Sequence, residues 1–129
     1  MQVLRCCGLL DESIKVSKRA SQIDPTIVTS APHTYFLQCD YGASIDCYGG
    51  RTGYCLDAAA WAALGATERA RKLLTERLAQ VTLSGPMTTL MRSLKLILKG
   101  SGAEAAELMR DLSEIREPEG LVYFARHFS

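Results

Sequence analysis

The fold of this chain is decided by one stretch of its sequence, Gly8-Leu-Leu-Asp-Glu-Ser-Ile-Lys-Val-Ser-Lys-Arg-Ala-Ser-Gln-Ile-Asp-Pro25. Its apolar residues recur at the three-to-four spacing that places them on one face of a helix. Glycine at one end suits a tight turn, and the residue before proline at the other end avoids the α region. The stretch therefore predicts a helix that begins after Gly8 and ends before Pro25.

The rest of the chain repeats this alternation of helical segment and break. Glycine, proline or aspartate interrupts the apolar pattern repeatedly, for example at Leu64-Gly65, Ser84-Gly85-Pro86 and Lys99-Gly100. Each segment between breaks is expected to hold a helix of about 10–17 residues, and alternating strand-like runs are lacking. Short connections between such helices predict antiparallel αα-hairpins. We expect hairpins near 1–25, 26–50, 54–82 and 86–115, followed by a terminal helix at 118–128.

The quoted stretch resembles, almost position by position, the second half of a tetratricopeptide repeat. That half normally reads glycine, polar, aromatic, acidic, glutamate, alanine and isoleucine, and closes on an apolar residue followed by Asp-Pro. Here Ser13 takes the small packing position and Ala20 the later one, while Leu10 replaces the usual aromatic residue.

Weaker copies of the same pattern follow at Cys39-Asp-Tyr-Gly-Ala-Ser-Ile, Gly65-Ala-Thr-Glu-Arg-Ala-Arg and Gly100-Ser-Gly-Ala-Glu-Ala-Ala. The turn positions 8, 39, 65 and 100 are separated by 31, 26 and 35 residues, around the family's period of about 34. The resemblance covers most of the chain. It implies a single all-α domain over 1–129, in which stacked antiparallel αα-hairpins form a right-handed α-α superhelix.

In this family the first helix of each hairpin lines a concave groove, and the resemblance carries that role onto three segments here. The implied groove residues are Thr29, His33, Phe36 and Leu37 in the second hairpin, Cys55, Ala59, Ala62 and Ala63 in the third, and Leu90, Leu94, Ile97 and Leu98 in the fourth. This set is apolar and lacks the basic residues with which some members clamp a peptide carboxylate. It would suit an amphipathic helix. The leucines of the fourth hairpin could equally fill a tightly wound core.

Composition excludes several functional classes. With 15 basic and 14 acidic residues the net charge is +1, so the surplus that a nucleic-acid-binding protein uses to neutralise phosphates is missing. We expect no membrane partner, because no run approaches the roughly 20 apolar residues of a membrane span. The first ten residues are a poor signal peptide, which favours a cytoplasmic location. The five cysteines are an odd number without paired spacing, so we expect neither disulfides nor a metal site.

Catalytic motifs are equally scarce, and we expect no enzyme activity and no cofactor. His33 has no acidic residue at helical spacing, and Gly49-Gly-Arg-Thr-Gly53 lacks the lysine-hydroxyl ending of a phosphate-binding loop. The charged run Glu68, Arg69, Arg71, Lys72, Glu76 and Arg77 predicts a solvated helix face. Trp61 is expected to anchor a hairpin.

The preferred interpretation is a non-catalytic scaffold that binds a peptide or partner protein in a concave groove. Both ends of the repeat pattern are incomplete, so we expect the chain to be an excerpt of a longer protein. One alternative is a self-associating arm, in which the apolar stripe of Val122, Phe124, Ala125 and Phe128 in the terminal helix docks on another copy, similar to repeat arms of bacterial multidomain signalling regulators. A second alternative is a small-molecule sensor or enzyme with an apolar pocket around His33, Phe36 and Trp61.

Overall fold

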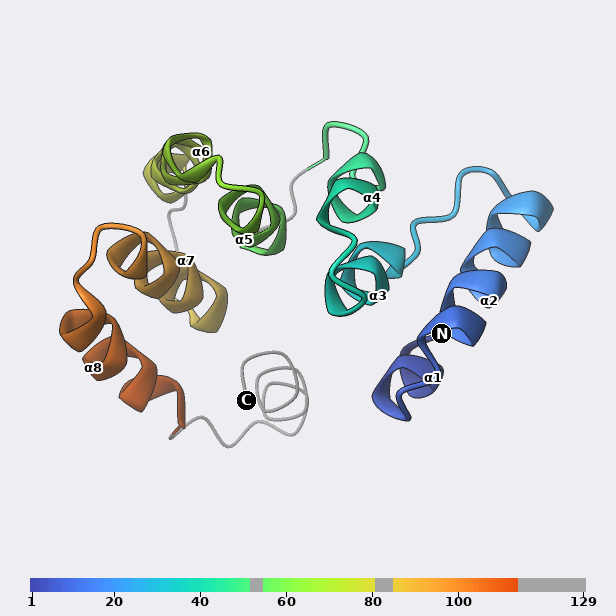
Figure 1. Ribbon diagram of the computed structural model, residues 1–129, viewed down its shortest axis with the longest axis horizontal. Helices are drawn as coiled ribbons and strands as arrows, with labels where there is room; N and C mark the ends of the chain where they lie inside the picture. The colour runs from blue at the N-terminus through green and yellow to red at the C-terminus, as the bar shows by residue number, and fades with distance from the viewer. Residues whose placement is uncertain (52–54, 81–84, 114–129) are drawn as a thin grey trace.

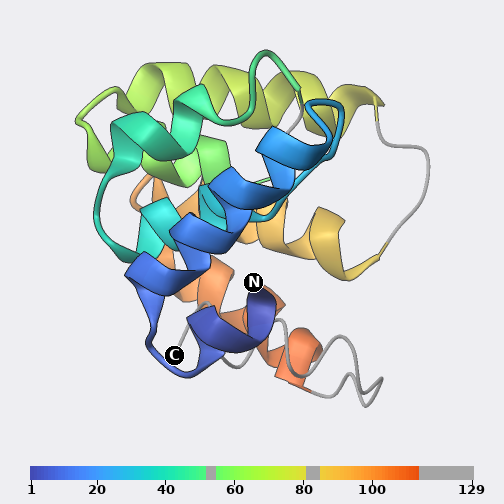
Figure 2. The ribbon, with the colours of Figure 1, turned by 90° about the vertical axis from the view of Figure 1, so that its right-hand side faces the viewer.

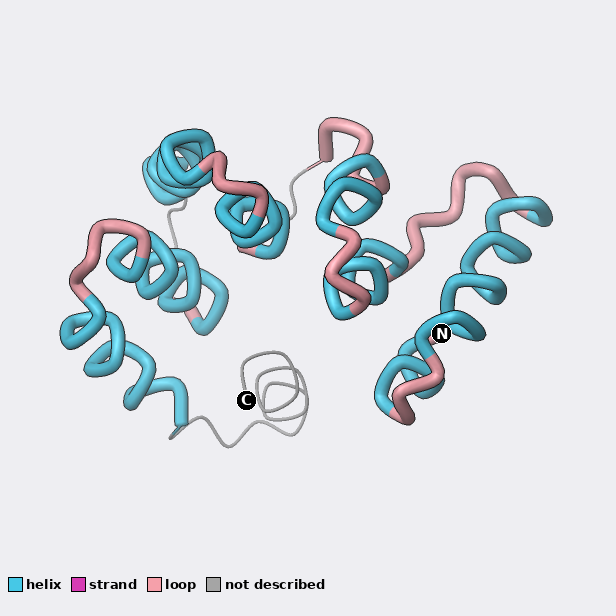
Figure 3. Tube along the Cα trace, in the orientation of Figure 1, coloured by secondary structure: helices cyan, strands magenta, loops and turns pink. Residues whose placement is uncertain are grey.

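The computed structural model describes residues 1–51, 55–80 and 85–113. Every regular element in these ranges is a helix (Figure 3). The helices in chain order are α1 (Gln2–Cys6), α2 (Leu10–Ile23), α3 (Ala31–Leu37), α4 (Tyr41–Asp46), α5 (Leu56–Ala63), α6 (Thr67–Gln80), α7 (Pro86–Ile97) and α8 (Gly102–Ser113). The expected all-α class is therefore confirmed for the described ranges. The terminal helix expected at 118–128 lies outside them.

The helices are arranged as consecutive pairs along an arc (Figure 1). Each odd-numbered helix packs on the even-numbered helix that follows it, and successive pairs meet where α2 contacts α3, α4 contacts α5 and α6 contacts α7. Helices α3, α5 and α7 lie on the inner side of the arc, and α4, α6 and α8 lie on its outer side (Figure 1). Seen from one end, the α1–α2 pair is nearest to the viewer with the later pairs behind it (Figure 2). The direct contact of α3 with α5 continues the inner layer.

All four pairs turn through the same backbone geometry, at the positions where the sequence predicts a turn. The turn residues have positive φ angles: 78° at Gly8, 60° at Cys39, 84° at Gly65 and 84° at Gly100. The next residue in each turn donates its backbone N–H to the carbonyl five residues earlier: Leu9 to Leu4, Asp40 to Tyr35, Ala66 to Trp61 and Ser101 to Leu96, each at 2.9 Å. This is the bond with which a Schellman motif satisfies the last carbonyls of a helix.

The second helix of each pair also approaches its neighbours at an equivalent position. The fifth residue after each turn residue is small and buried, with exposed fractions of 0% for Ser13, Ser44 and Ala70 and 2% for Ala105. A small side chain at this point lets two helix backbones come close without a void. Ser13 therefore occupies the small packing position predicted for it, whereas Ala20 is only half-buried.

The expected helix length of about 10–17 residues is wrong for three helices. Helices α3, α4 and α5 contain 7, 6 and 8 residues. Helix α3 begins only at Ala31, with Pro32 in its first turn, so 24–30 form a loop. Helix α4 ends at Asp46 and is followed by Gly49 and Gly50 at φ 52° and 80°, angles that no α-helix contains.

The apolar core lies between the third and fourth pairs. Its buried members are Cys55, Ala58, Ala70, Leu74, Leu90 and Met91. Trp61, Met87 and Leu94 pack around them. Leu74 is fully buried, and a buried leucine contributes roughly 1.5–3 kcal/mol relative to an exposed one. This cluster is the main apolar contribution to stability in the described ranges.

Hydroxyl hydrogen bonds connect the first two pairs instead. The hydroxyls of Ser13 in α2 and Thr34 in α3 are 3.0 Å apart and both residues are buried. Ser17 and Thr29 are joined in the same way at 2.8 Å. Ser44 in α4 donates to the carbonyl of Pro32 at 2.9 Å. Each bond satisfies groups that would cost free energy if they were buried alone.

One buried ion pair joins α5 to α6, which corrects part of the predicted solvated face. Arg77 donates from Nη1 and Nη2 to the two carboxylate oxygens of Asp57, at 2.6 and 2.5 Å, and the two side chains are 14% and 8% exposed. The Asp57 carboxylate raises the pKa of Arg77, while burial lowers it less. Arg77 is therefore a structural residue rather than a solvated one. Arg69, which is exposed, lies with its guanidinium carbon 3.6 Å from the ring centroid of Trp61.

Candidate functional site

A small apolar cavity lies where the inner helices meet. It has a volume of about 50 Å³ and is lined by Phe36 and Leu37 of α3, by Cys55, Leu56 and Ala59 at and after the start of α5, and by Leu90 and Leu94 of α7. Its walls contain no charged side chain. A water molecule needs about 10–15 Å³ by the same measure, so the cavity has room for a single aliphatic side chain.

Each wall of the cavity is held by contacts outside it. The ring of Phe36 packs edge-on against Tyr41 of α4, with centroids 5.2 Å apart and planes at 66°. The Asp57–Arg77 pair ties the first turn of α5 to α6. Burial raises the pKa of the Cys55 thiol to about 11, so this thiol stays protonated at neutral pH and behaves as a small apolar group. The cavity is thus a preformed apolar site rather than a reactive one.

The structure brings together part of the implied groove set. Phe36, Leu37, Ala59, Leu90 and Leu94 line the one cavity together with Cys55. Leu56, which the resemblance did not single out, also lines the cavity. It is the first residue of α5 and directly precedes Asp57, and nothing in the sequence alone distinguishes it from other leucines.

The other implied groove residues lie elsewhere. Thr29 lines a separate polar cleft, and His33 is half-buried in α3 without reaching the cavity. Ala62 packs on the apolar core, and Ala63 is exposed at the end of α5. Thr29 precedes α3, and the other three face other sides of their helices because the short α3 and α5 present fewer than three turns to the inner layer.

The leucines of α7 serve the core and the cavity at the same time. Leu90 is 3% exposed and belongs to the apolar cluster, and Leu94 packs on that cluster, yet both line the cavity. Leu98 packs on the core, whereas Ile97 is 55% exposed. The two interpretations of the fourth hairpin are therefore not exclusive, since one face of a helix can close a core and leave a hollow beside it.

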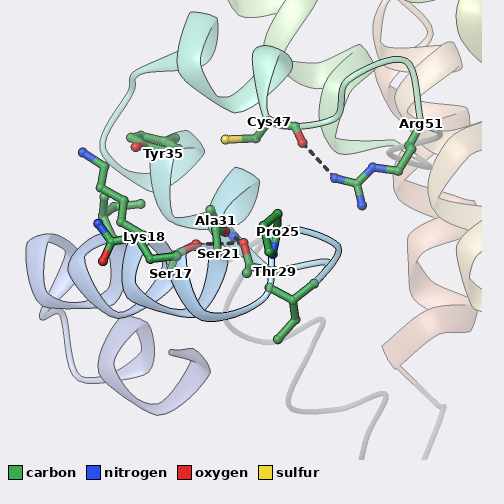
Figure 4. A pocket seen from close by; sticks show the side chains of 12 residues that line it. Ser17, Lys18, Ser21, Pro25, Thr29, Ala31, Tyr35, Cys47 and Arg51 are labelled. Carbon is green, nitrogen blue, oxygen red and sulfur yellow. Dashed lines mark hydrogen bonds between the residues drawn. The ribbon is translucent and has the colours of Figure 1, made fainter.

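A second, larger hollow lies between α2 and the α3–α4 pair (Figure 4). This polar cleft has a volume of about 560 Å³ and is open to solvent. Ile14, Ser17 and Ala31 are buried and form its floor, and Tyr35 and Cys47 are half-buried at its side. The loop of residues 24–30 shapes one edge, because Thr26 donates from its backbone nitrogen and its hydroxyl to Oδ1 of Asp24, at 2.9 and 2.6 Å.

The charged groups of the polar cleft are both cations. Lys18 and Arg51 line it, and none of its twelve lining residues is acidic. Arg51 is held in place because Nε donates to the carbonyl of Tyr48 and Nη2 to that of Cys47, both at 3.0 Å. The thiol of Cys47 has a raised pKa, first from burial and then from the nearby Asp46. Asp46 is the acidic residue closest in sequence to Cys47 and Arg51.

Metal-ligating groups and membrane-spanning helices were both sought in the described ranges. No three residues among their histidines, cysteines, aspartates and glutamates are grouped so that they could hold a metal ion. No helix there has the length and apolar character needed to cross a bilayer. Of the three residues of the alternative pocket, Phe36 lines the apolar cavity, Trp61 packs on the apolar core and His33 is half-buried in α3.

Comparisons with family models, with curated proteins and with solved structures returned no match to this chain.

Proposed function

We propose that this chain is a non-catalytic scaffold of tetratricopeptide-like hairpins, wound as a right-handed superhelix, that binds a peptide or a partner protein on its inner side. Four turns of one geometry and a buried small residue five positions after each turn support a repeated unit. The observation that carries the binding proposal is the apolar cavity, because first helices of three successive pairs build it together.

The occupant that fits this cavity is one aliphatic or methionine side chain of a partner helix. A helix presents such an anchor with further apolar contacts three and four residues away. Leu37 lines the cavity while it is 41% exposed, so its free surface is available to those flanking contacts. A pocket of about 50 Å³ is well below the roughly 300–1,000 Å³ of small-molecule sites, which disfavours the sensor alternative.

A selection of displayed peptides on the full chain tests the proposal. Helical peptides with randomised apolar positions would be selected, and the affinity of the best binder measured by fluorescence anisotropy. We expect one dominant apolar anchor among the selected sequences. Leu37→Asp is expected to weaken binding at least tenfold, since it places a charge at the mouth of an apolar pocket.

Leu64→Asp is the matched control, because Leu64 is a similarly exposed leucine, at 52%, that does not line the cavity. It should leave the affinity within about twofold, and circular dichroism would verify that both variants are folded. Equal weakening by the two variants, or selected peptides without a common anchor, would contradict the proposal. A concentration-dependent dimer that Leu37→Asp dissociates would point instead to self-association.

A further inference from the structure

We propose that the polar cleft between α2 and the α3–α4 pair is a second binding site, which takes an extended acidic peptide segment. It goes beyond the apolar cavity in place and in chemistry, because the two hollows share no lining residue. The argument rests on the cleft's charge, on the positions of its two cations and on its hydrogen-bonding floor.

Charge selects the class of ligand. The cleft is lined by Lys18 and Arg51 and by no carboxylate, in a chain whose net charge is only +1. The carboxylates nearest in sequence, Asp24 and Asp46, do not line the cleft, and Asp24 accepts its two hydrogen bonds from Thr26 at the edge. The hollow therefore favours anionic groups over neutral or cationic ones.

The positions of the cations select the shape of the ligand. Lys18 extends from α2 at one side of the cleft and Arg51 reaches in from the segment after α4 at the other, with Thr29 and Pro25 between them (Figure 4). An extended peptide with acidic side chains at separated positions can meet both cations, which is why we commit to a peptide.

The groups between the cations suit a peptide backbone. Ser21 and Gln22 of α2 and Tyr35 of α3 line the same cleft and supply side-chain donors and acceptors. The floor is rigid, because the Ser17–Thr29 hydrogen bond of 2.8 Å fastens the 24–30 loop to α2. Arg51 is already oriented by its two backbone acceptors, so less side-chain freedom is lost when a carboxylate binds.

The test uses the full chain and two labelled octapeptides with blocked ends. The acidic probe carries two glutamates at each end and serines between them, and the neutral probe replaces every glutamate by glutamine. Fluorescence anisotropy at low salt is expected to give an affinity for the acidic probe about tenfold higher, falling as salt is raised. Lys18→Glu and Arg51→Glu are each expected to weaken it about three- to tenfold.

Lys72→Glu is the control of equal charge change, because Lys72 lies on the exposed face of α6 and lines neither hollow. It is expected to leave the affinity within twofold. Equal effects of all three reversals, a response of only one of Lys18 and Arg51, or displacement of the probe by inorganic phosphate at equal concentration would each overturn the proposal. So would the absence of binding. Leu37→Asp should leave the acidic probe bound, which separates this outcome from the fate of the apolar cavity.

Discussion

The junction of the first two helix pairs and that of the last two are built from the same turn but different chemistry. Ser13 and Ser44 occupy the small packing position in the first two pairs, and Ala70 and Ala105 occupy it in the last two, all buried. The serines use their hydroxyls to bond the neighbouring helix, while Ala70 belongs to the apolar cluster and Ala105 is buried without a polar group to satisfy. One backbone geometry thus accepts two kinds of junction, provided that the side chain is small and its polar group is satisfied.

The two hollows follow the same division. The apolar cavity adjoins the cluster of α5 and α7, whereas the polar cleft opens beside the hydroxyl-bonded junction of α2 and α3. Hydrogen-bonded junctions need only a few contacts and leave room around them. Apolar junctions gain free energy in proportion to the apolar area that they bury. Their helices therefore pack until only a small cavity is left.

The largest effect is expected where the apolar junction is broken. Leu74→Ala removes a fully buried side chain of α6, and such truncations cost about 2–5 kcal/mol in the free energy of unfolding. Urea unfolding followed by circular dichroism would measure it. Leu64→Ala, at a leucine that is 52% exposed, should change the free energy by less than about 0.5 kcal/mol. Similar losses for the two would mean that the cluster does not dominate stability.

The second largest effect is a pH dependence of the free energy of unfolding, which arises from Cys55 in the apolar junction. Burial raises the pKa of Cys55 from 9.0 to about 11, so above pH 9 the unfolded chain loses this proton before the folded chain does. Stability is therefore complete below pH 9 and falls as the pH rises towards 11, by roughly 2 kcal/mol. Chemical unfolding at pH 8 and pH 10.5 would show this loss in the wild type. It should be largely missing in Cys55→Ala, and an equal loss in both proteins would refute the assignment.

Substitutions in the hydroxyl-bonded junction should change the free energy of unfolding less, and the effects of two such substitutions should not be additive. Ser13→Ala leaves the buried hydroxyl of Thr34 without its 3.0 Å partner, at a cost of about 1–2 kcal/mol. Thr34→Val alone should cost less, because the Ser13 hydroxyl keeps its 3.2 Å hydrogen bond to the carbonyl of Met1. The double variant should cost clearly less than both together, because neither polar group is then stranded. Strictly additive unfolding free energies would show that the bond contributes nothing.

The smallest effect is expected at the turn in which Cys39 replaces the glycine of the other three turns. Cys39 has φ 60°, a conformation that costs a residue with a Cβ roughly 1 kcal/mol. Cys39→Gly should therefore stabilise the chain by up to about 1 kcal/mol, offset in part by the greater freedom of glycine when unfolded. Gly65→Ala, at φ 84°, should destabilise it by a similar amount. Thermal melts of both variants would reveal the opposite signs.

The short-range features of this fold could be predicted from sequence. The turns at Gly8, Gly65 and Gly100 and the end of α2 before Pro25 follow from backbone preferences of single residues, whereas the turn at Cys39 follows from its place in the repeated pattern. The short helices α3 and α4 could not be predicted as well. Their apolar spacing continues past the residues at which the helices end, and competition from Pro32, Gly49 and Gly50 settles their length.

The candidate sites were predictable in part. Phe36, Leu37, Ala59, Leu90 and Leu94 were implied by the family resemblance, and the structure places them around one cavity. Lys18 and Arg51 were not recognised, because residues 33 positions apart, one in α2 and one in the segment after α4, carry no common signal in sequence. Glycines around Arg51 marked a loop, but only its bonds to the carbonyls of Cys47 and Tyr48 fix the guanidinium where it lines the cleft.

By itself, the sequence determined the helical class and where the chain turns, because both depend on the conformational preferences of one residue and its nearest neighbours. Tertiary structure alone decided which buried groups became partners. Asp57 meets Arg77 twenty residues later, and Ser13 meets Thr34 rather than solvent. Those pairings depend on how closely and at what angle two helices approach, which is set by all the side chains between them at once.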